Sequence, residues 1–169
     1  MKKKLKKVII PFLLLSFALN IFLIYHYYDE EKKEKEELGF VVNNLIFNMN
    51  ESVNHLNDLD MSHPDYKNRL ILVYRNFAEN EGFINAHIKE MPRNLVSWNG
   101  EMVVGLGNGI YEVDEEGTEE TVEDILNFSN GYHNEIQHLN PEEHPYEALQ
   151  VMETVLSNQK YMGERFIYQ

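Results

Sequence analysis

Glu135 and His138 have the residue types and the spacing that could bind a metal ion. The Glu-x-x-His spacing places both side chains on one face of a helix and occurs in carboxylate-bridged metal bundles. Such bundles need a second copy of the motif and inward-facing glutamates from two more helices, and no second copy is found. The apolar face of this predicted helix contains Tyr132, Ile136 and Leu139. Glu135 and His138 lie beside that face and not within it. We therefore expect exposed polar positions, keep Glu135 and His138 as weak metal candidates only, and predict no cofactor.

No other catalytic pattern is present in the sequence. It contains no Gly-x-Ser-x-Gly elbow, no His-Glu-x-x-His helix and no Walker loop. The absence of cysteine excludes thiolate metal ligands, disulfides and a cysteine nucleophile. Residues 105–109, GLGNG, lack the Lys-Ser/Thr that follows a phosphate loop, so a turn is expected there. The sequence thus predicts that the protein is not an enzyme.

The N-terminal region combines a basic start with a long apolar run. Five lysines occur in the first seven residues, and residues 8–25 are almost entirely apolar. This pattern predicts a cytoplasmic tail (1–7), a single transmembrane signal anchor (8–28) and an extracytoplasmic domain (29–169) in the cell membrane. A cleaved signal peptide is the alternative, although its apolar core is usually shorter and ends at a small-x-small site.

Two polar residues, Ser16 and Asn20, interrupt the apolar run. They are four residues apart and share one helical face. Inside a bilayer such side chains can hydrogen-bond a second helix, so the sequence predicts a possible membrane helix contact at Ser16 and Asn20. The lipid bilayer itself is the first predicted partner of this N-terminal helix.

The charge of the chain excludes one class of partner. The sequence has 28 acidic residues against 15 basic ones, a formal net charge of -13, and no acidic residue precedes Asp29. The body is therefore strongly acidic and repels polyanions, so no nucleic acid partner is expected. Frequent Asn, Lys, Glu and Ile are typical of a bacterial genome rich in A and T.

Apolar spacing predicts a mainly α fold for the extracytoplasmic domain. After a charged helical stretch at 29–37, one line of residues repeats at alternating intervals of four and three, the spacing of a bundle helix. Its members are Leu38, Val42, Leu45, Met49, Ser52, Leu56 and Leu59. Capping signals at 60–65 start a second helix that runs to about Glu90 through Leu70, Val73, Phe77, Ile84 and Ile88.

A β insertion is predicted between the second and third helices. Residues 95–113 contain β-formers interrupted by Asn99-Gly100 and by glycines at 107 and 109, a strong hairpin signal. A third helix should begin near Thr118 and reach Leu139, and a fourth should begin at Asn140-Pro141 or near Pro145 and reach about Lys160. The predicted fold is thus a bundle of about four helices with a small β-hairpin or meander at 95–113.

These features favour an interaction or regulatory role over catalysis. An anchor, helical seams and few motifs suit a membrane-anchored protein that contacts an envelope protein or forms a homo-oligomer. The alternative is a ligand-sensing domain that acts through a partner subunit; in architecture alone it resembles the helical sensor modules of bacterial receptors. An envelope enzyme is the least favoured hypothesis.

Overall fold

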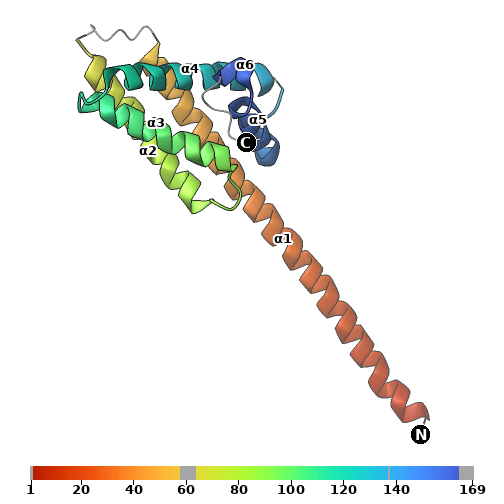
Figure 1. The fold of residues 1–169 in the computed structure, drawn as a ribbon. Coiled ribbons are helices and arrows are strands. Elements are labelled where there is room, and N and C mark those ends of the chain that lie inside the picture. Colours follow the sequence, from red (N-terminus) through yellow and green to blue (C-terminus); the bar gives the residue numbers. More distant parts are fainter. Residues whose placement is uncertain (1, 58–63, 137, 164–169) are drawn as a thin grey trace. The chain divides into compact units, whose positions relative to one another are not determined.

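The computed structural model describes residues 2–57, 64–136 and 138–163, with side chains from Leu13 onward. Six helices follow one another along this part of the chain, and none of its residues forms a β-strand (Figure 1). The helices are α1 (Lys2–Leu56), α2 (Tyr66–Ala86), α3 (Arg93–Ile110), α4 (Glu115–Ile136), α5 (Pro145–Leu156) and α6 (Gln159–Met162). The chain divides into two compact units, residues 1–37 and 38–169, and α1 supplies residues to both.

The larger unit, residues 38–169, is a helical bundle whose core includes the predicted seam of α1. All six seam residues between Leu38 and Leu56 are buried, including the single polar member Ser52. Leu59, the last member of the predicted seam, lies outside the described residues. The alternation of three- and four-residue steps therefore identified the buried face of this helix correctly.

The buried face of α2 follows the predicted spacing, and α4 and α5 begin close to their predicted starts. On α2 the buried apolar residues end at Ile84, because the helix ends at Ala86 and leaves Ile88 exposed. On α4, Asp114 accepts a hydrogen bond from the backbone N–H of Gly117 over 3.0 Å, so the helix begins before Thr118. Helix α5 begins at Pro145, the later of the two predicted starts.

The predicted β insertion at 95–113 is wrong, because residues 95–110 belong to α3 and residues 111–113 form the turn that follows it. Its buried apolar residues recur at intervals of three and four, which is helical spacing. They are Leu95, Trp98, Met102 and Leu106. Asn99, expected in a hairpin turn, instead donates a buried hydrogen bond to the carbonyl oxygen of Phe77 on α2 over 3.1 Å.

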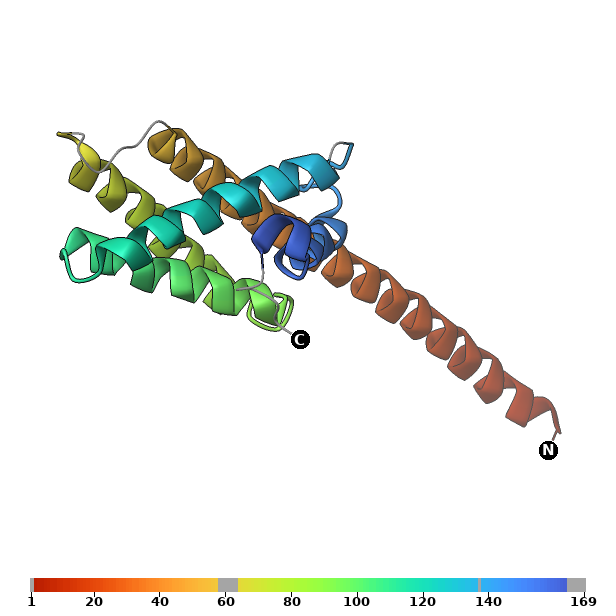
Figure 2. The same cartoon turned by 45° about the horizontal axis from the view of Figure 1, so that its top comes forward.

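Two glycines of α3, Gly105 and Gly109, allow close helix packing and do not form a turn. A Cβ atom on Gly105 would collide with the side chain of Thr121 on α4, and one on Gly109 would collide with Thr118. Their missing side chains let the two helices approach closely. Figures 1 and 2 show α3 beside both α2 and α4 within this unit, in agreement with the contacts among the three helices.

The predicted membrane anchor at 8–28 is also wrong. Within the described part of the chain, no helix combines the length and the apolarity that crossing a membrane requires. From Leu13 onward the apolar side chains of α1 are interrupted by Ser16 and Asn20 and give way to His26 and then to Asp29. The predicted single-pass location, with a cytoplasmic N-terminus and an extracytoplasmic body, is corrected accordingly.

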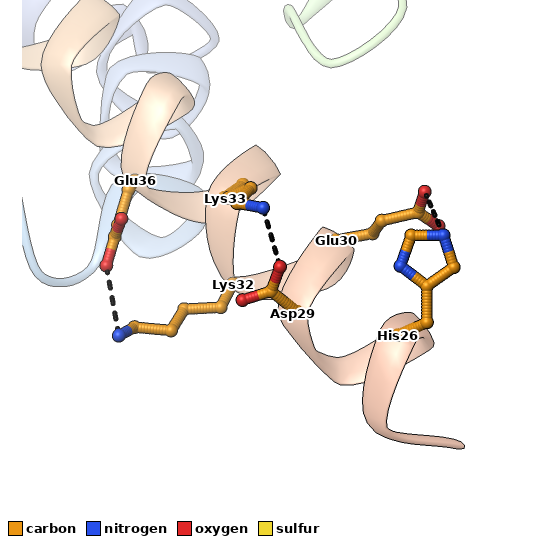
Figure 3. A network of polar contacts seen from close by, with 6 residues as sticks. All are labelled: His26, Asp29, Glu30, Lys32, Lys33 and Glu36. Atoms are coloured by element: carbon orange, nitrogen blue, oxygen red, sulfur yellow. Dashed lines mark hydrogen bonds and ion pairs between the residues drawn. The ribbon is translucent and has the colours of Figure 1, made fainter. Parts of the chain in front are cut away.

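The charged stretch of α1 is an exposed helix with ion pairs along it (Figure 3). Lys33 Nζ lies 2.6 Å from Oδ2 of Asp29, four residues earlier. Lys32 pairs with Glu36 at 3.5 Å in the same way. The hydrogen bond between Lys33 and Asp29 lowers the pKa of the aspartate and raises the pKa of the lysine. Because these groups are exposed, such pairs add little stability.

Candidate functional site

The weak metal candidates from the sequence lie in one groove, named here the α4–α5 groove. It is open to solvent and has a volume of about 450 Å³. The end of α4 and the following turn supply Glu135, Ile136, His138 and Leu139, and α5 supplies Glu147, Gln150, Val151 and Thr154. The structure therefore brings Glu135 and His138 to the same surface, together with polar residues that the sequence did not single out.

Glu135 and His138 do not share a helical face. Helix α4 ends at Ile136, so His138 lies in the turn beyond it. Glu135 accepts a hydrogen bond from the Tyr161 hydroxyl over 2.6 Å. Among the described residues, no group of three or more His, Asp and Glu side chains is arranged to hold a metal ion. The spacing argument therefore does not apply to this pair, because the helix on which it depends ends between them.

The lining of the α4–α5 groove suits a small ligand with a cationic or hydrogen-bond-donating group. Glu135 and Glu147 contribute carboxylates, while Gln150 and Thr154 contribute an amide and a hydroxyl. Apolar side chains of both helices complete the wall, which is the usual composition of a small-molecule site. Glu147, Gln150 and Thr154 were missed, although their spacing of three and four along α5 was a detectable signal.

A second candidate surface lies in the smaller unit and is named here the apolar segment, residues 13–28 of α1. Every Leu, Ile, Phe and Tyr in it is more than half exposed, from 53% for Leu19 and Ile21 to 72% for Tyr25. These side chains surround most of the helix, since successive residues are rotated by about 100°. A helix that is apolar on most sides is normally buried by other structure. Ser16 and Asn20, the predicted contact residues, are both exposed on this segment.

Comparisons with known proteins assign no family. No family model matches the sequence, and neither the curated proteins nor the solved structures include a significant match. The two surfaces described above therefore carry the functional argument.

Proposed function

We propose that the chain is an interaction protein that binds another protein chain through the apolar segment of α1. The supporting observation is the exposure of every large apolar side chain in residues 13–28. Full burial of one such side chain contributes about 1.5–3 kcal/mol relative to leaving it in water. A partner that covered several of them would offset the several kcal/mol that association costs in lost motion.

The charge distribution favours a protein partner over a nucleic acid. The chain has a net charge of -13, and the acidic residues begin directly after the apolar segment, at Asp29. A polyanion would be repelled there and would gain nothing from an apolar surface. An apolar helix is instead a common binding element when it enters a hydrophobic groove or a helix bundle.

Site-specific photo-crosslinking in the host cell tests this proposal. A photoreactive amino acid replaces Phe17 in the full-length chain, and a control chain carries it at Val104 on α3; the native side chains are 65% and 63% exposed. We expect discrete crosslinked protein products from position 17 and none from position 104. No protein product from position 17, or products with lipid alone, would contradict the proposal.

A second candidate function, ligand sensing, is supported by the α4–α5 groove. Its two carboxylates, Glu135 and Glu147, suit a small organic cation. The test is thermal unfolding of the full-length chain with a series of diamines and polyamines at millimolar concentration. Binding raises the melting temperature of the wild-type chain, and Glu147→Gln reduces that rise. Equal melting temperatures with and without every amine would remove this candidate.

A further inference from the structure

We propose that the partner of the apolar segment is a second copy of this chain and that the two segments pair antiparallel about Leu19. This inference rests on the proposed function, because it names the occupant of the same surface. It commits to one register. Two residues that lie at the same level on the two helices have numbers that add to 38, as 14 and 24 do. An apolar seam in the N-terminal unit sets that register, and the charges on both sides of the seam favour the antiparallel orientation.

The first feature is the symmetry of an apolar seam. Leu14, Phe17, Ile21 and Ile24 follow steps of three, four and three, the spacing of a coiled-coil seam. All four side chains are more than half exposed. The intervals are three, four and three residues whether they are counted from Leu14 or from Ile24. The seam is therefore symmetric about residue 19. In an antiparallel pair, Leu14 lies level with Ile24 of the second copy, and Phe17 lies level with Ile21.

The second feature is the arrangement of charges on both sides of the seam. Residues 2–7 include five lysines, while residues 29–37 include six acidic and three basic residues. Antiparallel pairing about residue 19 places residues 1–9, with a net charge of +5, level with residues 29–37 of the other copy, with a net charge of −3. Three of the five lysines then lie level with a glutamate and two with a lysine. Parallel pairing would place all five lysines of one copy beside those of the other, which is unfavourable because like charges repel.

The proposed pair also has closed symmetry. A two-fold axis through the level of Leu19 uses the same surface on both copies, so the interface is isologous and does not extend into a filament. Leu19 itself points away from the seam, because two residues along a helix correspond to a rotation of about 200°. Ser16 and Asn20 also lie off the seam.

Disulfide crosslinking measures the register directly, because the native chain has no cysteine. Leu14→Cys and Ile24→Cys are made in separate full-length chains of different mass, purified, mixed and oxidised. In the antiparallel pair the 14–24 disulfide forms, and each variant alone forms little covalent dimer. Positions 14 of the two copies would be about 15 Å apart along the axis, which is beyond the reach of a disulfide. Predominant 14–14 and 24–24 products would overturn the proposal.

A matched pair of substitutions tests which face of the helix forms the contact. Ile21→Asn changes the seam and Leu19→Asn changes the opposite side, while both native side chains are 53% exposed. Sedimentation of the full-length chains should show association weakened at least tenfold by Ile21→Asn and less than threefold by Leu19→Asn. Equal effects of the two substitutions, or a monomeric wild-type chain, would overturn the inference.

The two proposals fail in distinguishable ways. If the wild-type chain is monomeric while position 17 crosslinks a different protein in cells, the self-pairing falls and the interaction role stands. If position 17 yields no protein product, both proposals fall.

Discussion

The side-chain amide of Asn48 on α1 donates a hydrogen bond to the side-chain oxygen of Asn80 on α2 over 2.9 Å, and both residues are buried. Asn76, one turn before Asn80, donates to the backbone oxygen of Asn48 over 3.3 Å and to the hydroxyl of Ser52 over 3.2 Å. These bonds link two helices at defined positions along their axes. Apolar side chains alone would allow more sliding, so the polar groups fix the alignment of α1 and α2.

Replacing Asn80 by alanine should destabilise the larger unit by about 1–3 kcal/mol, because the amide of Asn48 would remain buried without its partner. Urea unfolding followed by circular dichroism measures this change. Asn54→Ala, at an exposed position on α1, is the control and should change the free energy of unfolding by less than about 0.5 kcal/mol. In the double variant Asn48→Ala/Asn80→Ala, the two effects should not add.

Two glycines of α3 should respond in opposite ways to alanine. Gly105→Ala introduces a Cβ that collides with Thr121 and should cost about 1–3 kcal/mol. Gly100→Ala has open space around its new Cβ and should stabilise the helix by about 0.5–1 kcal/mol. Thermal unfolding of both variants measures the contrast. Destabilisation by Gly100→Ala would contradict the helix and favour an Asn-Gly turn, where a residue with a positive φ is needed.

Alkaline pH should destabilise the bundle through Tyr132. Burial raises the pKa of its hydroxyl well above the ordinary value of about 10, so the folded state holds this proton more tightly than the unfolded state. Its contribution is complete below about pH 10 and is lost as the pH rises beyond that value. Unfolding by urea at pH 8 and pH 11 measures the loss, and Tyr132→Phe should reduce it.

At neutral pH, Tyr132→Phe should leave the free energy of unfolding within about 0.5 kcal/mol of the wild-type value or increase it. The reason is that the buried hydroxyl has no hydrogen-bond partner among the described residues. Tyr111→Phe, at a residue that is 80% exposed, is the control. A large loss for Tyr132→Phe at pH 8 would show that the hydroxyl is paired.

Trp98, the single tryptophan, should report on the centre of the bundle. It is only 3% exposed, and its ring lies 4.3 Å from that of Phe128 and 5.6 Å from that of Phe77, measured between centroids. We expect blue-shifted emission that external iodide hardly quenches. Phe128→Ala should cost about 3–5 kcal/mol, whereas Phe47→Ala at an exposed position should cost far less. Strong quenching of the folded wild-type chain would contradict this position.

The sequence predicted the helices that contain no strong turn signal, and it failed in α3, where turn-forming residues hid a helical spacing of apolar residues. The seam of α1 from Leu38 to Leu56 was confirmed because burial follows the helical period. The stretch 95–113 was wrong because Asn-Gly and repeated glycines favour turns locally. In α3, Gly105 is required instead by the closeness of Thr121, a residue of another helix that no local pattern reveals.

The candidate groove was predictable only in part. Glu135 and His138 were identified by their spacing and do lie on one surface, but the end of α4 at Ile136 separates them. The exact end of a helix is among the least certain features of a sequence. The buried asparagines were missed as a network, although the polar Ser52 inside the α1 seam was a visible sign of polar contacts in the core.

The close approach of Gly39 on α1 to the backbone of Glu142 has a consequence for synthesis on the ribosome. A Cβ at Gly39 would collide with the carbonyl oxygen of Glu142, so these backbones touch within the larger unit. Translation makes residue 39 before residue 142, and 103 positions separate the two. The start of the buried seam, including Leu38, therefore emerges long before this late segment can cover it. During that interval a nascent chain exposes this face to chaperones and to neighbouring nascent chains.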